Sequence, residues 1–453
     1  ILNDNKMSIS HNVGAIARYL SNMRIQPWYL RVKKYIEGGL SHFPVVGGYL
    51  KKHLQKSKSK LKRLIYKDTF FDSMGFTYYG PVDGHDMDEL KKALQAAKRM
   101  TSPVLLHVVT KKGKGYQYAE NDPKNFHGIG SFDVETGEPL SSGVGFSDVF
   151  GDYLTDAAKE DRTICAITAA MKSGTGLNNF AQTYKNRFFD VGIAEEHAVS
   201  FAAGLALGGL VPVVAIYSSF LQRAVDQILH DVCMQKLHVI FAVDRAGLVG
   251  ADGETHQGCF DLSYLSMMPN MTVLAPKNDR ELEEMLAFAV SFDGPIAIRY
   301  PRGSAHQGLQ EYQAPVEYGR SEIIRKGKKI AVLGVGSMIP SCMEICKGLK
   351  DDGYDPTFVN VRFVKPLDVD LLDELAKDHS LFVTVEENVK SGGYGEHVSA
   401  YMEACHPEIR VLSAAVWDRF VPQGNVESLR SRIGLGVEDI RQAIEDSEEL
   451  REQ

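Results

Sequence analysis

Two adjacent carboxylates follow an apolar segment near the middle of the chain. The run FDVGIAEE at residues 189–196 ends in Glu195 and Glu196, and from Ala198 onward small and apolar residues recur at helical spacing. We therefore expect a strand, an acidic turn and a helix, with both carboxylates at the loop edge of an α/β unit. Carboxylates at such an edge can act as general acids or bases. They can equally well stabilise the positive end of the helix, and this segment alone leaves both roles open.

Two later loops share this pattern. Residues 215–223 (AIYSSFLQR) and 244–258 (DRAGLVGADGETHQG) each leave an apolar, strand-like run and enter a polar loop. The loops carry Tyr, Arg, Asp and His side chains, and the glycines among them let the backbone approach a ligand closely. A site assembled from several loops therefore becomes the favoured interpretation of the carboxylates.

The composition is that of an ordinary globular protein. With 453 residues the chain is too long for a single hydrophobic core, so we expect two or three domains. The net charge of −7 argues against a dedicated nucleic-acid binder. The six cysteines form no CxxC pair and are expected to be reduced, mostly buried thiols. No apolar stretch approaches the length of a membrane span.

Alternating strands and helices predict an α/β fold. A helix is expected at 87–99, and a strand at 104–110 runs into the glycine-containing loop 111–116. Further strands are expected near residues 163–168, 212–217, 238–244, 271–275, 296–300, 329–336, 357–364 and 381–386. This alternation indicates mainly parallel sheets covered on both faces. The basic run 51–67 is expected to be a solvated face.

The motifs together resemble those of one family from the first residues to near the C-terminus. The chain is similar to the 1-deoxy-D-xylulose-5-phosphate synthases, thiamine-diphosphate enzymes of the transketolase-like group. The matching motifs are NDNKMSIS (3–10), GPVDGH (80–85), GIAEEHAV (192–199), AIYSSFLQR (215–223), DRAGLVGADGETHQG (244–258) and RYPRG (299–303). The resemblance implies decarboxylative condensation of pyruvate with D-glyceraldehyde 3-phosphate to 1-deoxy-D-xylulose 5-phosphate and CO2. This is the first step of the methylerythritol phosphate isoprenoid pathway, and it also feeds thiamine and pyridoxal phosphate synthesis.

The resemblance also implies three α/β domains of a transketolase-like, thiamine-diphosphate-binding fold. Residues 1–140 would be the C-terminal remainder of the diphosphate-binding domain, and 141–302 the aminopyrimidine-binding domain. A linker at 303–318, where the periodicity is lost, would lead to a transketolase-type C-terminal domain at 319–453. Such an enzyme would be a homodimer in the bacterial cytoplasm, or in the plastid if the chain comes from a plant.

A metal site is implied only in part. The family binds Mg²⁺ through a Gly-Asp-Gly segment and a later Asn, together with diphosphate oxygens. Here Asn5 would supply a side-chain oxygen and Met7 a backbone oxygen, the kind of ligand that Mg²⁺ prefers. The Gly-Asp-Gly half would lie before residue 1, and the chain opens without an initiator Met. We therefore expect the sequence to be part of a longer protein.

The family motifs assign cofactor contacts. Glu195 would hydrogen-bond N1′ of the aminopyrimidine as the activating acid, whereas Glu196 would meet solvent, a neighbouring subunit or the helix terminus. Ile193 would lie under the bent cofactor and Phe220 would stack on its aminopyrimidine. Tyr116 matches a further cofactor-contacting tyrosine.

The same motifs assign substrate contacts and two histidines. Arg245 and Arg302 match the positions that bind the acceptor phosphate. Of the nearby residues, Tyr217, Arg223 and Asp252 would also contact substrate. His256 would bind the acceptor hydroxyl or aldehyde oxygen and move a proton, and His127 matches another active-site histidine.

Two alternatives remain open. Transketolase or a pyruvate dehydrogenase E1 component would share the cofactor and the carboxylate, although residues 217–223 together with ADGETHQG (251–258) favour the synthase. The chain could also be a non-catalytic assembly module, since the Gly-Asp-Gly half is absent from it. The region after the linker has no chemical motif beyond EEN (386–388) and GG (392–393).

Overall fold

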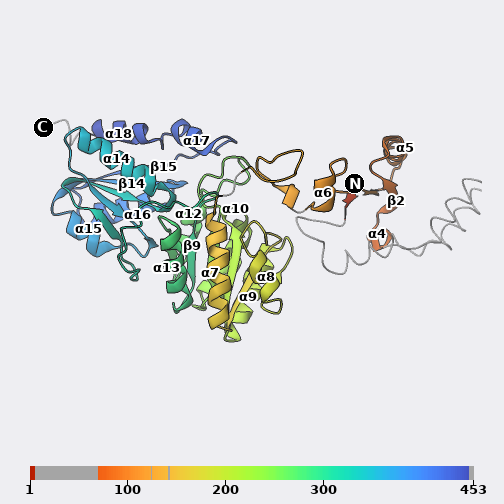
Figure 1. Cartoon of the computed structure of the whole chain (residues 1–453), viewed down its shortest axis with the longest axis horizontal. Helices are drawn as coiled ribbons and strands as arrows, with labels where there is room; N and C mark the ends of the chain where they lie inside the picture. Colours follow the sequence, from red (N-terminus) through yellow and green to blue (C-terminus); the bar gives the residue numbers. More distant parts are fainter. Residues whose placement is uncertain (6–69, 124, 141–142, 448–453) are drawn as a thin grey trace, which may run out of the picture. The chain divides into compact units, whose positions relative to one another are not determined.

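The computed structural model describes residues 1–5, 70–123, 125–140 and 143–447. They belong to two compact units, residues 1–140 and 141–453 (Figure 1). Met7 and the basic run 51–67 lie outside the described residues. The predicted α/β class with mainly parallel sheets is confirmed. The finer division of the second unit at the linker stays a prediction.

The first unit is built on a three-stranded parallel sheet. Its order is β1 (Leu2–Asp4), β3 (Val104–Val109) and β2 (Thr77–Asp83). Helix α5 (Met87–Lys98) begins where Asp86 accepts hydrogen bonds from two backbone N–H groups of the first turn. The helix buries Ala93 against β2 and β3. The predicted helix and the strand at 104–110 are confirmed, whereas β2 was not predicted.

The second unit contains a seven-stranded sheet that is covered on both faces. Its strands, in spatial order, are β13 (Phe363–Lys365), β8 (Thr272–Leu274), β9 (Ile296–Arg299), β7 (Ile240–Asp244), β6 (Val211–Tyr217), β4 (Ile164–Thr168) and β5 (Phe188–Asp190). All neighbouring strands are parallel except β13, which is antiparallel to β8.

Alternating side chains of these strands enter two different cores. Ile240 and Ala242 of β7 face helices α7 (Phe146–Glu160) and α13 (Asp279–Val290), which pack side by side (Figure 1). Phe241 and Val243 point to the other face, where α9 (Glu195–Leu207) packs on β6. This period of two is that of a strand buried on both faces.

A second sheet in the same unit has five strands. Their order is β10 (Glu322–Arg325), β12 (Thr357–Asn360), β11 (Lys329–Gly334), β14 (His379–Val389) and β15 (Arg410–Val416), and β10 is antiparallel. Helices α14 (Ile339–Asp351) and α18 (Val437–Glu445) cover one face. Ala331, Leu333 and Phe382 on the other face join the core beneath the seven-stranded sheet. Residues 303–318 contain no helix or strand.

The strand predicted at 357–364 is wrong as a single element. The chain turns at Arg362, whose φ of 49° lies in the left-handed region, so β12 joins the five-stranded sheet and β13 joins the seven-stranded one. The Arg362 side chain is 1% exposed and pairs with Glu281 at 2.6 Å and Glu322 at 3.1 Å. Lys277 pairs with the same two carboxylates at 2.8 Å each. A buried ionic cluster therefore stabilises the turn, and the spacing of apolar residues in the sequence could not predict it.

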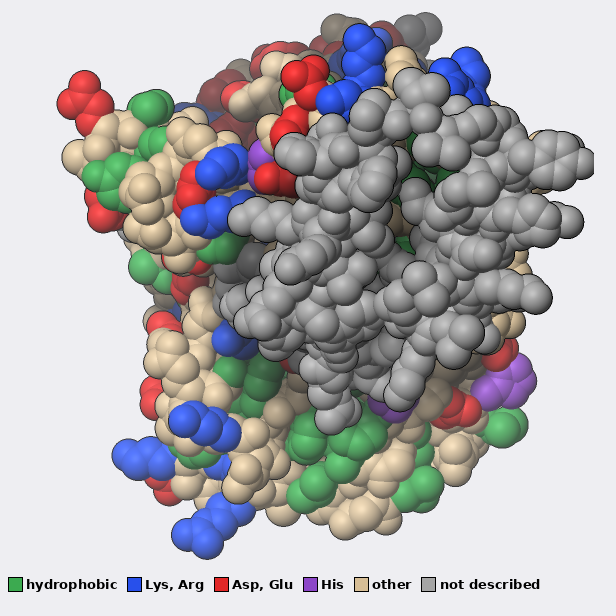
Figure 2. Space-filling view, turned by 90° about the vertical axis from the view of Figure 1, so that its right-hand side faces the viewer, with side chains coloured by type: hydrophobic (Ala, Val, Ile, Leu, Met, Phe, Trp, Pro, Cys, Tyr) green, Lys and Arg blue, Asp and Glu red, His purple; other side chains and the backbone are tan. Residues whose placement is uncertain are grey.

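The cysteine thiols are free, as the sequence predicts, and charges of both signs lie on the surface. All six cysteines are free, and only Cys405 is exposed. Acidic and basic side chains are interspersed on the face shown in Figure 2, outside the grey residues. Among the described residues, no helix has both the length and the apolar character needed to cross a membrane.

Candidate active site

The predicted site residues of the second unit gather at one edge of the seven-stranded sheet. The chain order reverses between β4 and β6, which are neighbours although β5 lies between them in sequence. In open α/β sheets, ligands bind outside the carboxyl ends of the strands at such reversals. Tyr217 ends β6, while Glu195, Arg245 and Arg302 follow β5, β7 and β9. Since these strands are parallel, their carboxyl ends share that edge.

A tight turn between β5 and α9 positions Glu195. The Asp190 carboxylate at the end of β5 accepts hydrogen bonds from the N–H groups of Ala170 at 2.8 Å and Gly192 at 3.1 Å. Gly192 has a φ of 77°, which favours glycine. Glu195 then begins α9 and is only 2% exposed, whereas Glu196 is exposed. The structure thus distinguishes the two adjacent carboxylates by burial.

Glu195 is linked to an aromatic group through Arg223. Its Oε1 accepts a hydrogen bond from Arg223 Nη1 at 2.6 Å, and the Arg223 guanidinium lies 5.0 Å from the centre of the Phe220 ring. That ring in turn contacts His256, edge to face at 5.1 Å, and Tyr217 at 5.7 Å. Arg223, which was predicted near the acceptor phosphate, therefore contacts the buried acid.

Two further arginines share one carboxylate oxygen. Asp252 Oδ2 accepts from Arg302 Nη1 at 2.8 Å and from Arg245 Nη1 at 3.2 Å. The Arg245 guanidinium also lies 3.9 Å from the Tyr217 ring centre. Burial raises the pKa of Tyr217 to about 12, although Arg245 opposes this shift. Because a guanidinium has several N–H donors, both arginines can bind further acceptors such as a phosphate.

Asp244 ends β7 directly before Arg245 and was not among the predicted site residues. It is fully buried, accepts a hydrogen bond from the Ser147 hydroxyl at 2.7 Å, and its other oxygen has no partner among the described residues. Burial raises the pKa of the Asp244 carboxyl to about 7. Its place at the end of β7, directly before Arg245, was the available signal in the sequence.

The predicted residues of the first unit include Asn5, which directly follows β1. The preceding Asp4 is buried and its Oδ2 lies 3.0 Å from His107 Nε2, while His107 Nδ1 lies 2.7 Å from the Tyr78 hydroxyl. These bonds hold β1 against β3 at the point where the chain reaches Asn5. The amide oxygen of Asn5 is a suitable ligand for a hard divalent cation.

Tyr116 and His127 lie in the loops of the same unit. The Tyr116 hydroxyl donates to the Val134 carbonyl at 2.8 Å, and its ring contacts Phe126 at 5.6 Å. His127 is exposed at the end of a short 3-10 turn, η1 (Asn125–His127). Partial burial lowers the pKa of His127, and Lys112 acts in the same direction. The roles of both residues stay predictions.

The edge of the seven-stranded sheet fits the aminopyrimidine of thiamine diphosphate. Among the described residues, Arg223 is the only side chain that hydrogen-bonds the Glu195 carboxylate, so the carboxyl can still bond a ligand. Ile193, two residues earlier, is 61% exposed, which is unusual for a large apolar side chain next to a buried acid. A buried acid, an exposed aliphatic group and the Phe220 ring match a flat heterocycle with a ring nitrogen.

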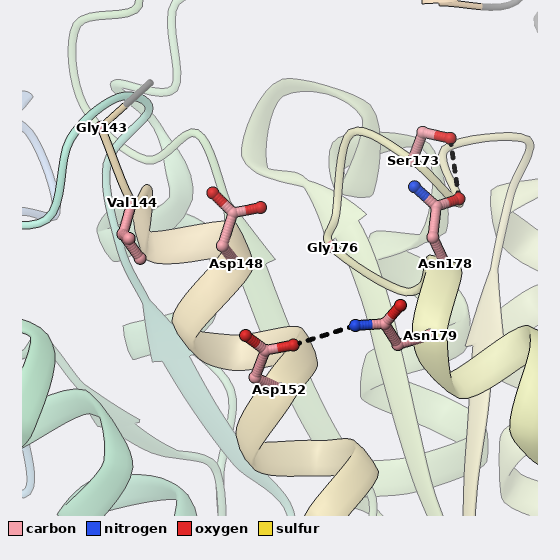
Figure 3. Close-up of a pocket in the computed structure, with 8 residues that line it drawn as sticks. All are labelled: Gly143, Val144, Asp148, Asp152, Ser173, Gly176, Asn178 and Asn179. Carbon is pink, nitrogen blue, oxygen red and sulfur yellow. Dashed lines mark hydrogen bonds between the residues drawn. The ribbon is translucent and has the colours of Figure 1, made fainter. Parts of the chain in front are cut away.

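A separate cavity of about 450 Å³ opens near the starts of α7 and α8 (Asn178–Thr183). Figure 3 shows its polar lining, in which Asn179 donates to Asp152 at 3.2 Å and Ser173 donates to Asn178 at 3.0 Å. None of the predicted site residues lines this cavity. We therefore assign no ligand to it.

Three family models match successive parts of the chain. The first, described as 1-deoxy-D-xylulose-5-phosphate synthase, matches residues 1–110. The transketolase pyrimidine-binding domain matches residues 142–307, and the transketolase C-terminal domain matches residues 319–440.

Solved structures show the same fold. A structure titled "Split gene transketolase, inactive beta4 tetramer" aligns with a TM-score of 0.60 and 29% identity, over 68% of this chain and 99% of that chain. Transketolase from Campylobacter jejuni aligns with a TM-score of 0.57 over 85% of this chain and 70% of that one. Its identity is 17%, so this second likeness supports the fold alone.

Curated relatives are more similar in sequence. 1-Deoxy-D-xylulose-5-phosphate synthase from Lachnoclostridium phytofermentans is 50% identical over 97% of this chain and 71% of its own length. The enzyme of the same name from Clostridium tetani is 46% identical over 98% of this chain and 72% of its own length. Identity at this level over nearly the whole chain shows that the chain and these enzymes belong to one family. It agrees with the motifs and with the geometry at the sheet edge. The chain belongs to the 1-deoxy-D-xylulose-5-phosphate synthase family.

Proposed function

We propose that the edge formed by β5, β6, β7 and β9 is where this chain performs the reaction of its family. That reaction condenses pyruvate with D-glyceraldehyde 3-phosphate, releases CO2 and forms 1-deoxy-D-xylulose 5-phosphate. The observation that carries the proposal is the buried Glu195 carboxyl, which Arg223 links to the Phe220 ring, together with Arg245 and Arg302, which share the Asp252 carboxylate at the same sheet edge. An acid for the cofactor and cations for a phosphate are the two chemistries that this reaction needs.

Thiamine diphosphate, held through a divalent metal, supplies the nucleophilic carbon that lets pyruvate lose CO2. We propose that Glu195 holds a proton at N1′ of the aminopyrimidine, and that Ile193 and Phe220 contact the rings. Burial removes water that would compete for this hydrogen bond. Arg223, bound to the other side of the carboxylate, orients it. For the metal we propose Mg²⁺, with Asn5 and Met7 among its ligands.

The acceptor aldehyde is held by the second group of residues. Arg245 and Arg302 bind its phosphate, and Asp252, which holds both guanidinium groups in place, contacts the polyol chain together with Tyr217. His256 lies next to Phe220 and is placed to donate a proton to the carbonyl oxygen as the new C–C bond forms. We propose His127 as another hydrogen-bond donor in this reaction, as the family motif implies.

We further propose a homodimer in which α9 is covered by the partner. This helix has small or apolar residues on nearly every side, yet Ser200, Gly204 and Leu207 are exposed. A helix that is apolar all round is normally buried. Leu207 is 66% exposed, and Met234, which follows the π-helical segment η3 (Ile228–Cys233) packed on α9, is 67% exposed. Because the relatives are bacterial, we place the enzyme in the bacterial cytoplasm.

A product assay tests the proposal. With thiamine diphosphate and Mg²⁺, the protein is expected to form 1-deoxy-D-xylulose 5-phosphate from pyruvate and D-glyceraldehyde 3-phosphate, detected by mass and by CO2 release. Transfer of a two-carbon unit from xylulose 5-phosphate in place of pyruvate would assign it to transketolase chemistry. Absence of both activities in protein that binds the cofactor would contradict the proposal.

A further inference from the structure

We propose that Gln257 is a positioning residue for the acceptor site, through which residues 421–424 hold the loop that carries Asp252 and His256. We call residues 247–258 the acceptor loop and residues 421–424 the brace. The inference rests on the proposed function of the acceptor loop. It gives the C-terminal part of the chain a role in catalysis that its own motifs do not suggest.

Gln257 joins the loop to the brace with both ends of its amide. Its side-chain oxygen accepts hydrogen bonds from the N–H groups of Val249 at 2.7 Å and Gly250 at 3.3 Å. Its Nε2 donates to the carbonyls of Pro422 at 3.1 Å and Val421 at 3.4 Å. Gln257 is 3% exposed, so water does not replace these bonds. The amide has two donors and two acceptor positions, and this arrangement uses all of them.

Backbone contacts also hold the acceptor loop close to the brace. Gly424 N–H donates to the Gly250 carbonyl at 3.2 Å. A Cβ atom at Gly250 would lie 2.6 Å from the Gly424 carbonyl oxygen, and one at Gly253 would lie 3.2 Å from Gln423 Cβ. Both loop glycines also have positive φ, 76° and 75°. The loop is therefore shaped to follow the brace, and no larger residue fits at Gly250 without movement.

Other contacts fix the base of the loop and Asp252, but Gln257 is the side chain that ties the loop to the brace next to His256. Gly247 and Gly258 close its base through two backbone hydrogen bonds of 2.7 Å. Between them, Asp252 is exposed and His256 is only partly buried. Asp252 meets Arg245 and Arg302, whereas His256 directly precedes Gln257 in sequence. The distance from His256 to the phosphate-binding arginines thus depends on how Gln257 holds the loop, and catalysis is sensitive to such placement.

Gln257→Glu is the informative substitution. The glutamate keeps acceptor oxygens for Val249 and Gly250, but it places an oxygen opposite the carbonyls of Val421 and Pro422, where a donor is needed. Gln257→Asn keeps the amide chemistry and is one methylene too short to reach both segments. Gln313→Glu is the matched control, because Gln313 is exposed and, among the described residues, its side chain donates to the Gln310 carbonyl alone, at 2.7 Å.

The test compares steady-state kinetics of these variants, loaded with thiamine diphosphate and Mg²⁺. For Gln257→Glu we expect the KM for D-glyceraldehyde 3-phosphate to rise about tenfold or more, with cofactor affinity and the KM for pyruvate unchanged. Gln257→Asn should show a smaller change in the same direction, and Gln313→Glu none. If Gln257→Glu does not fold, the Asn variant decides by the same comparison.

Two outcomes would overturn the inference. One is a folded Gln257 variant whose two KM values both match those of the parent. The other is a lower melting temperature with no selective change in the acceptor KM, which is what a merely structural residue would give. Arg302→Ala, measured in parallel, separates this from failure of the proposed function: if Arg302→Ala also leaves the acceptor KM unchanged, the acceptor site itself is wrongly placed.

Discussion

Replacing Arg302 with alanine separates binding of the acceptor phosphate from the stability of the fold. In the structure the Arg302 side chain is 32% exposed and its partner Asp252 is 34% exposed. An ion pair that exposed contributes about 0–1 kcal/mol to folding. Arg245 still pairs with the same Asp252 oxygen after the substitution. We therefore expect Arg302→Ala to fold normally, with a melting temperature close to that of the parent.

The effect on catalysis should be much larger. A hydrogen bond to a charged group contributes roughly 1.5–3 kcal/mol, which corresponds to about 10- to 150-fold in kcat/KM. This loss should appear with D-glyceraldehyde 3-phosphate and disappear with unphosphorylated D-glyceraldehyde, which offers nothing to the guanidinium. Arg302→Lys should lie between, because an ammonium keeps the charge without the fork of donors.

The assay is therefore the ratio of kcat/KM for the two acceptors at saturating pyruvate. The matched control is Arg280→Ala, since Arg280 is 41% exposed and pairs with Glu284 along one helix face at 2.9 Å. That variant should leave the ratio unchanged. An equal loss with both acceptors, or a loss that also raises the KM for pyruvate, would refute the assignment of Arg302 to the phosphate.

Three other perturbations follow from buried groups. Glu195→Gln should lower kcat by about 100-fold or more while leaving the melting temperature unchanged, and near-normal turnover would contradict its role. The pKa of Asp244 is raised from 3.8 to about 7, so the folded state keeps a proton that the unfolded state loses, and stability falls as pH rises between those values. Asp244→Asn should remove this loss of stability, which is roughly 4 kcal/mol at most. Urea unfolding of parent and variant near pH 4 and pH 7 measures the change in unfolding free energy with pH. An equal change in both proteins would contradict this role of Asp244. Arg362→Met should cost about 3–5 kcal/mol of unfolding free energy because Glu281 and Glu322 stay buried with one cation fewer; a cost below about 1 kcal/mol would contradict the ionic cluster.

The regular elements of this fold are largely predictable because their signal is local. The helix α5 and the strands β4, β6, β7 and β11 follow periodicity that the residues themselves display, and each lies where it was predicted. Strands β2, β10 and β15 were not predicted, although β15 contains the apolar run VLSAAV. In β2 the Gly80-Pro81 pair interrupts the pattern, and only pairing with β3 makes it a strand.

Motifs selected the candidate site residues, but they did not show which of them touch each other. Arg223 and Arg245 both lie in polar loops with aromatic neighbours, and nothing in sequence spacing assigns the first to Glu195 and the second to Asp252. That assignment depends on where β6 and β7 end in the sheet. Gln257 is a clearer case. Its four hydrogen bonds join segments more than 160 residues apart, and no local pattern reports such a pairing.

Two arginines show where long-range contacts override local preference. Arg245 and Arg362 have φ angles of 58° and 49°, a conformation that costs a non-glycine residue about 1–2 kcal/mol. Contacts with residues distant in the sequence hold each arginine in this conformation. Arg245 lies on the Tyr217 ring and pairs with Asp252, and Arg362 pairs with Glu281 and Glu322. The left-handed backbone at Arg245 places its guanidinium against the Tyr217 ring and Asp252. The group that we propose for the acceptor phosphate therefore has a backbone conformation that a non-glycine residue rarely adopts. At Arg362 it separates two strands into two sheets and thereby joins the C-terminal part of the chain to the sheet that carries the site.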